Sequence, residues 1–159
     1  MDKFEIKDGV AIIPKGTREI PNNAFFGCSS LTTIIIPESV TSIGSGAFEG
    51  CSSLTSVVIP ESIKRIGSFA FSGCSSLTSV VIPESVTSIE GHAFYGCSSL
   101  EIVHLPAGVS NIEIDAFKDC RNLKAIYVPL DKVNYYKEHF PSSMHWLIVE
   151  EGSDLPVKP

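Results

Sequence analysis

The sequence predicts an α/β repeat protein, a solenoid in which short coils stack on one another. The first observation is that cysteine, proline, leucine, phenylalanine and isoleucine each recur every 23 residues, in five registers that stay in phase. The second is that residues 37–59 and 60–82 are identical at 18 of 23 positions. The third is that the pattern weakens at both ends of the chain, where a solenoid needs caps.

Large or reactive side chains occupy two of these registers. The cysteine register consists of Cys28, Cys51, Cys74, Cys97 and Cys120. The phenylalanine register consists of Phe25, Phe48, Phe71, Phe94 and Phe117.

The N-terminal segment predicts a hairpin that closes the first coil. The stretch FEIKDGVAII holds two apolar runs on either side of Asp8 and Gly9. An Asp-Gly pair suits a two-residue hairpin turn, which needs positive φ at both central residues. We therefore assign residues 1–13 to an N-terminal cap.

Each repeat predicts a short strand, a turn and a compact return. In residues 54–60, LTSVVIP, the β-branched cluster favours a strand, and the final proline ends it because proline has no N–H for a ladder. Alternation turns Val57 and Ile59 into the core, so that Ser56 and Val58 face outward. The return segment SGAFEGC is long enough for only a turn or two of helix. One coil cannot bury its own apolar face, so stacking has to supply the core.

The C-terminal end predicts a second cap. The stretch LDKVNYYKEHF predicts a helix in phase with a seventh coil, with Phe140 in the phenylalanine register. The stretch HWLIVE predicts a last strand, with Trp146 in the leucine register.

These assignments give one domain over residues 1–150. It consists of the N-terminal cap, five 23-residue repeats over residues 14–128 and a C-terminal cap over residues 129–150. Residues 151–159, EGSDLPVKP, are polar and contain proline, so we expect a flexible tail or linker.

The pattern L-x-x-[IV]-x-[IL]-P, followed by [IV]-x-x-I and A-F-x-x-C, resembles the BspA-like leucine-rich repeat family from about residue 8 to residue 150. The resemblance implies a right-handed leucine-rich-repeat solenoid. It would have a parallel β-sheet on the concave side and short helical or irregular turns on the convex side. Similar proteins are commonly surface proteins of bacteria or of some protists that bind host or partner proteins.

The same resemblance implies a location on the cell surface or outside the cell. The N-terminal sequence MDKFEIKDGV is mixed and charged, which is not the pattern of a signal peptide, so a cytoplasmic location stays open. A net charge of −6 argues against a nucleic-acid partner, which would need clustered Lys and Arg. No apolar run is long enough to cross a bilayer, so we expect no membrane insertion.

The cysteines invite a metal, disulfide or packing interpretation. Metal ligands usually come in close pairs such as C-x-x-C, whereas here each coil has one cysteine. Neighbouring coils would bring the cysteines within disulfide range, but parallel side chains in a ladder are poorly oriented to bond. We favour small buried thiols that fill a fixed core position.

The other polar registers predict no catalysis. Paired serines follow the first four cysteines and favour turns. The four histidines lie in different registers, so no nucleophile has a repeated base beside it. Glu38, Glu61 and Glu84 would form an acidic strip. This strip could be a weak calcium site or simply a solvated edge, and the solvated edge is the favoured interpretation. We expect no enzyme activity, no cofactor and no metal site.

The outward strand positions are the candidate partner-binding site. Such β-branched residues suit any strand, but a contiguous exposed apolar patch often marks a binding surface. The predicted binding face consists of Thr33, Ile35, Ser56, Val58, Ser79, Val81, Ile102, His104, Ala125 and Tyr127.

These positions predict a non-enzymatic protein-binding module that acts as a monomer, with a host extracellular or surface protein as the candidate ligand. The alternative is a structural spacer or self-assembling repeat unit without a specific ligand. Six strands of about three residues, spaced by roughly 4.8 Å, expose about 300 Å². A standard interface buries about 800 Å² per partner, so adjoining loops would have to contribute.

Overall fold

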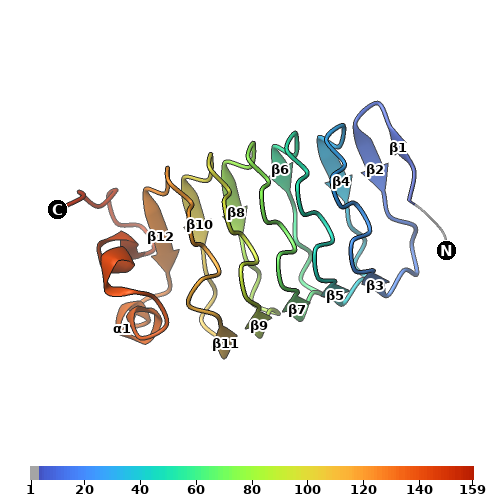
Figure 1. Cartoon of the computed structure of the whole chain (residues 1–159). Helices are drawn as coiled ribbons and strands as arrows, with labels where there is room; N and C mark the ends of the chain where they lie inside the picture. Colours follow the sequence, from blue (N-terminus) through green and yellow to red (C-terminus); the bar gives the residue numbers. More distant parts are fainter. Residues whose placement is uncertain (1–3) are drawn as a thin grey trace.

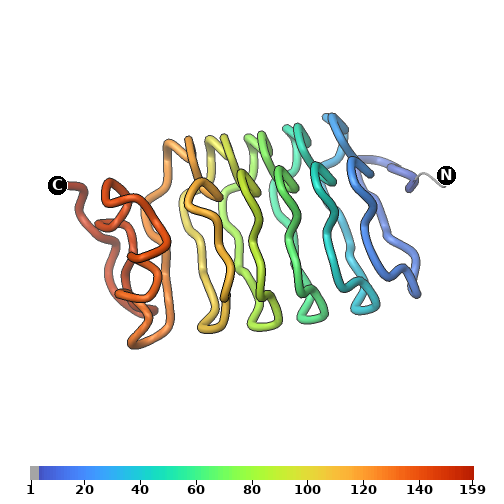
Figure 2. The backbone as a smooth tube through the Cα atoms, turned by 60° about the horizontal axis from the view of Figure 1, so that its bottom comes forward, coloured from blue at the N-terminus to red at the C-terminus, as the bar shows by residue number. Residues whose placement is uncertain are grey.

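The computed structural model describes residues 4–159; the first three residues of the expected N-terminal cap lie outside the described residues. The coils stand side by side in one row, with the two chain ends at opposite ends of the row (Figures 1 and 2). This stacking confirms the predicted solenoid. None of the helices among residues 4–159 is long and apolar enough to cross a bilayer.

One side of the row is formed by the strands predicted in each repeat, which pair in parallel from coil to coil. We call this side the first sheet. Its strands are β1 (Ile6–Lys7), β2 (Val10–Ile12), β4 (Thr33–Ile35), β6 (Ser56–Val57), β8 (Ser79–Val81), β10 (Ile102–His104), β12 (Ala125–Val128) and β13 (Ile148–Glu150). Within the described residues it is divided into two four-stranded halves between β6 and β8.

A second parallel sheet, for which the sequence pattern contains no signal, runs along the return segments. Its strands have two residues each and lie in the order β11-β9-β7-β5-β3. They are β3 (Glu19–Ile20), β5 (Ser42–Ile43), β7 (Arg65–Ile66), β9 (Ser88–Ile89) and β11 (Asn111–Ile112). The following SGAFEGC-type segments form consecutive turns rather than a helix.

The predicted hairpin is present in the N-terminal cap. β1 pairs antiparallel with β2, and the turn residues Asp8 and Gly9 have φ of 52° and 80°. Both angles are positive, as a tight two-residue turn requires.

The C-terminal cap contains less regular structure than expected. The helix α1 covers only Val133–Lys137, and the 3₁₀-helix η1 (Ser142–Leu147) takes up Trp146, so the last strand, β13, begins at Ile148. Tyr136 is fully buried in this cap and donates its hydroxyl to the Pro106 carbonyl, which ties α1 to the repeats.

The core is a stack of identical side chains from successive coils. The phenylalanine rings from Phe25 to Phe117 stack at 5.1–5.3 Å between centroids and within 10° of parallel. Phe4 extends the stack at the N-terminal end, 5.6 Å from Phe25. Phe140 continues it at the C-terminal end, as its register predicted, but at 6.1 Å and tilted by 47°.

Candidate functional site

The outward face of the first sheet exposes one column of apolar side chains, as alternation predicted. We call it the outer column. The exposed fractions are 65% for Ile12, 51% for Ile35, 79% for Val58 and 61% for Val81. These residues occupy the same register, one in each successive coil, so their side chains form a contiguous apolar stripe rather than scattered positions.

The neighbouring outward column is mostly polar and confirms the strand alternation with one exception. Thr33, Ser56 and Ser79 are exposed, and Ile102 is half-buried. Ala125 is fully buried, so the prediction that it belongs to the exposed face was wrong. Its register partner is Ile102, and a single methyl group beside that longer side chain does not reach solvent.

The C-terminal end of the outer column is covered in part by the residues that follow the cap. The His104 and Tyr127 rings stack at 5.2 Å. His104 Nδ1 lies 2.7 Å from Glu151 Oε2, and the Tyr127 hydroxyl donates to the Ser153 carbonyl over 3.1 Å. Residues 151–153 are therefore anchored to the first sheet. No local pattern predicts this contact, because His104 and Glu151 lie 47 residues apart.

A shallow groove of about 390 Å³ lies where the first sheet is divided, between β6 and β8. We call it the sheet groove. Val58 and Val81 contribute apolar walls, while Glu38 and Glu61 lie at its rim. The groove therefore combines the most exposed part of the outer column with negative charge.

All three residues of the acidic strip, Glu38, Glu61 and Glu84, are exposed to solvent. Within residues 4–159, no group of three or more His, Cys, Asp or Glu side chains is placed to hold a metal ion. The exposed carboxylates can instead pair with cations on a partner.

Four of the five cysteines are buried in the core, Cys28 packs half-buried against it, and none forms a disulfide in the described chain. The Cys51 thiol donates to the Phe25 carbonyl over 3.1 Å, and the later cysteines make the same contact with the preceding coil. Burial raises the pKa of Cys51 to about 12, and it raises the pKa of Cys74 as well. Thiols in this state are poor nucleophiles at neutral pH.

The histidines remain in separate places, as their registers predicted. His139 and His145 contact backbone carbonyls within the cap, and His104 contacts Glu151. His92 contacts Asp115, with 3.3 Å between Nδ1 and Oδ2. None of these contacts places a serine or cysteine beside the imidazole.

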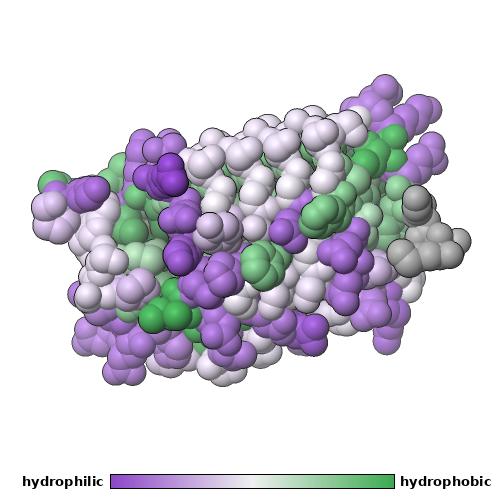
Figure 3. Space-filling model, viewed as in Figure 1, coloured by the Kyte–Doolittle hydropathy of each residue, from purple (hydrophilic) through white to green (hydrophobic). Residues whose placement is uncertain are grey.

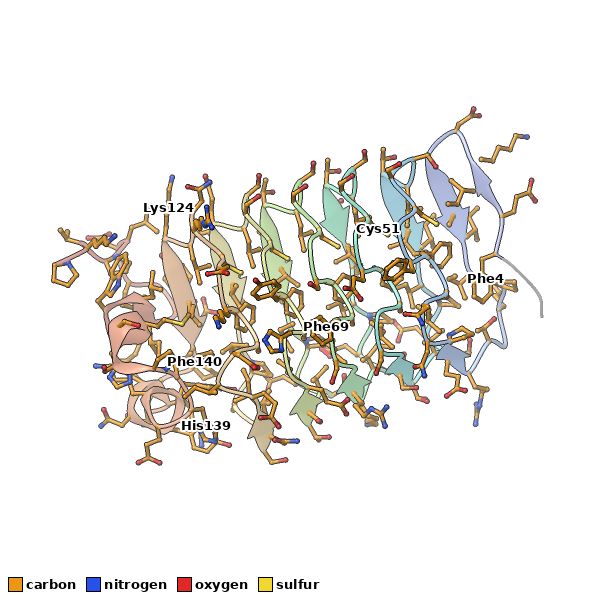
Figure 4. The ribbon with its side chains drawn as sticks, viewed as in Figure 1. Phe4, Cys51, Phe69, Lys124, His139 and Phe140 are labelled. Carbon is orange, nitrogen blue, oxygen red and sulfur yellow. The ribbon has the colours of Figure 1, made fainter. Side chains whose placement is uncertain are left out.

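One aromatic contact on the turn side of the coils was not predicted. Phe69 is 39% exposed and stacks on His92 at 4.9 Å. Both have φ near 60°, a conformation that costs a bulky residue free energy. The signal was present in the sequence, because Phe69 replaces Gly46 of the preceding, nearly identical repeat. Figure 4 labels Phe69, and the same view in Figure 3 shows only isolated green patches on this face.

Solved structures with the same fold come from bacteria. A leucine rich cell surface protein from Faecalibacterium prausnitzii is 35% identical, with a TM-score of 0.78, over 82% of this chain and 34% of that one. The leucine rich repeat protein of T. pallidum is also 35% identical, with a TM-score of 0.72, over 75% of this chain and 58% of that one. This chain thus spans about a third of the first protein and under two thirds of the second.

A more distant likeness concerns the fold alone. The pneumococcal vaccine antigen PcpA has a TM-score of 0.69 over 92% of this chain at 20% identity. A search of the curated proteins found no match. Residues 10–144 match the BspA type leucine rich repeat region in six copies. The chain therefore belongs to the BspA type leucine-rich repeat family.

Proposed function

We propose that this chain is a non-enzymatic, adhesin-like module that binds a protein ligand through the outward face of its first sheet. The observation that carries the proposal is the outer column. Four of its side chains are at least half exposed in consecutive coils, although burial of each would be favourable by about 1.5–3 kcal/mol. A soluble protein rarely keeps such a contiguous apolar stripe without a partner for it.

The sheet groove narrows the chemistry of that partner. Its apolar walls suit a branched or aromatic side chain, and Glu38 and Glu61 at the rim suit a Lys or Arg next to it. The proposed binding face consists of Thr33, Ile35, Ser56, Val58, Ser79, Val81, Ile102, His104 and Tyr127. Because the sheet alone is smaller than a standard interface, the ligand also contacts the loops that carry Glu38 and Glu61.

The proposed location is the cell surface or the extracellular space. The support comes from the related structures, one of which is described as a cell surface protein. Host extracellular-matrix and cell-surface proteins are the first ligands to test.

A capture experiment tests the proposal. The wild-type chain and a Val58→Asp/Val81→Asp variant serve as baits for extracellular-matrix extracts. Both side chains point to solvent, so the variant keeps the fold, but two carboxylates in the sheet groove remove an apolar contact. We expect a ligand captured by the wild type to be lost with the variant.

The matched control is a Leu130→Asp/Val157→Asp variant, which changes two equally exposed apolar residues outside the first sheet. It should capture the ligand as the wild type does. Equal capture by both double variants would refute binding through this face. Light scattering completes the test: a binding module keeps the mass of one chain at every concentration, whereas a self-assembling spacer grows.

A further inference from the structure

The turns that follow the second sheet are joined by a regular backbone ladder along the solenoid. In each of the first three coils of this ladder, three N–H groups donate to three carbonyls of the next coil. In the first coil the donors are Asn23, Phe25 and Gly27, and the acceptors are Ser45, Ala47 and Glu49, over 2.7–2.9 Å. The donors thus always point toward the C-terminal end of the row.

This ladder ends at the last complete coil. The N–H groups of His92, Phe94 and Gly96 find acceptors in that coil, at Asp115 Oδ1 and the carbonyls of Ala116 and Lys118. The equivalent N–H groups of Asp115, Phe117 and Asp119 have no acceptor among residues 4–159.

The cap explains the missing acceptors. The next carbonyls in register belong to residues 137–141, which close helix α1 and lead into η1. Lys137 is the last residue of α1, and a helix directs its carbonyls along its own axis rather than to the side. The Pro141 carbonyl accepts from the Met144 N–H instead. The tilt of Phe140, which is labelled in Figure 4, marks the same departure from the repeat.

The space left by the missing rung is a groove of about 700 Å³, which we call the C-terminal groove. One wall is the turn with the three free donors. The opposite wall is apolar and comes from Met144, Trp146 and Leu147 of η1. The groove therefore offers hydrogen-bond donors on one side and apolar contact on the other, which are the two kinds of contact that a bound peptide needs.

The charges around the C-terminal groove favour an acidic occupant. Lys118, Arg121 and Lys158 line it, and none of them has an ion-pair partner within the described chain. Two carboxylates line the groove, and one of them, Asp115, contacts His92. Asp119 is therefore the remaining carboxylate that faces the three cations.

We propose that the C-terminal groove binds an acidic peptide segment of a partner protein, and that this segment adopts the turns that residues 45–49 form within the stack. Three carbonyls of the segment accept from the N–H groups of Asp115, Phe117 and Asp119, and so supply the missing rung. An acidic side chain of the segment lies beside Lys118 and Arg121. This site is separate from the first sheet and does not depend on the proposed function of that sheet.

The repeat itself provides the probe, a synthetic peptide of residues 44–52 in which Ser replaces Cys51. It carries the three carbonyls that serve as acceptors within the stack, and its Glu49 occupies the register of Lys118. Amide hydrogen exchange measured by NMR on the full chain gives the readout. The matched reference amides are His92, Phe94 and Gly96.

In the free protein, the amides of Asp115, Phe117 and Asp119 should exchange at least about tenfold faster than the reference amides, because they are unpaired. The peptide should slow these three amides and leave the reference amides unchanged. Lys118→Glu/Arg121→Glu should weaken peptide binding by about tenfold or more, while Lys64→Glu, an exposed cation outside the groove, should not. A peptide with Lys in place of Glu49 should bind more weakly.

Three results would overturn the proposal. The three amides could already be as protected as the reference amides at every protein concentration. Their protection could rise with protein concentration alone, which would identify a second copy of the chain as the occupant. Saturating peptide could leave all three amides unchanged.

Discussion

At the scale of single residues, the phenylalanine stack couples each coil to its neighbours. Phe71 is fully buried and stacks on Phe48 and Phe94 at 5.1 and 5.2 Å. We expect Phe71→Ala to lower the free energy of unfolding by about 3–5 kcal/mol, because it removes two ring contacts and leaves a cavity between coils. Urea denaturation measures the change. The control is Phe26→Ala, which removes a 59% exposed ring and should cost less than about 1 kcal/mol.

The buried thiols predict a loss of stability at high pH. Burial raises the pKa of Cys51 from its ordinary value of 9.0 to about 12, so the folded state holds a proton that the unfolded state has released. This contribution is complete below pH 9.0 and is lost as the pH rises toward 12. The free energy of unfolding should therefore fall over this range. In the Cys51→Ala/Cys74→Ala variant, the free energy of unfolding should fall less steeply with pH. Equal slopes for the variant and the wild type would contradict this role of the buried thiols.

At the scale of elements, close contact between coils depends on glycine at particular positions. A Cβ on Gly67 would lie 2.7 Å from the Ser45 nitrogen and 2.8 Å from the Gly44 carbonyl carbon. Both are backbone atoms that a rotamer change cannot move. Gly67→Ala should therefore lower the free energy of unfolding by about 1–3 kcal/mol. In Gly108→Ala the new Cβ would meet no heavy atom within 4 Å, so thermal unfolding should show little change or a small gain.

The elements also show which features the sequence could predict. The strands of the first sheet and the Asp8-Gly9 hairpin carry local signals: alternation, a β-branched cluster and a turn pair. The second sheet has no such signal. Glu19–Ile20 and its successors are two residues long, and they become strands only because the neighbouring coil supplies their hydrogen bonds.

The candidate sites divide in the same way. Alternation located the outer column because exposure on a strand follows from register. It could not locate the contact of Glu151 with His104, which joins residues far apart in sequence. It also could not locate the C-terminal groove. That groove arises where the cap leaves the repeat, so its unpaired donors are evident only from the absence of a next coil.

At the scale of the whole molecule, stability is a sum over coils and the interfaces between them. Residues 37–59 and 60–82 differ at only 5 of 23 positions, so each presents nearly the same surface to its neighbours. Phe48, Phe71 and Phe94 are spaced almost equally along the stack. A coil can therefore stack on the coil after next with its contacts in register.

This equivalence predicts that a chain lacking residues 60–82 still folds. Phe48 would then stack on Phe94, and the acceptors of Ala93 and Tyr95 would replace those of Ala70 and Ser72. Circular dichroism should show one cooperative thermal transition at a lower midpoint, since one coil and one interface are lost. Deletion of residues 60–70 removes less sequence, but it shifts every later register by half a coil. The core side chains of neighbouring coils then no longer stack on one another. This chain should be unfolded, and equal stability of the two deletions would mean that register does not hold the stack together.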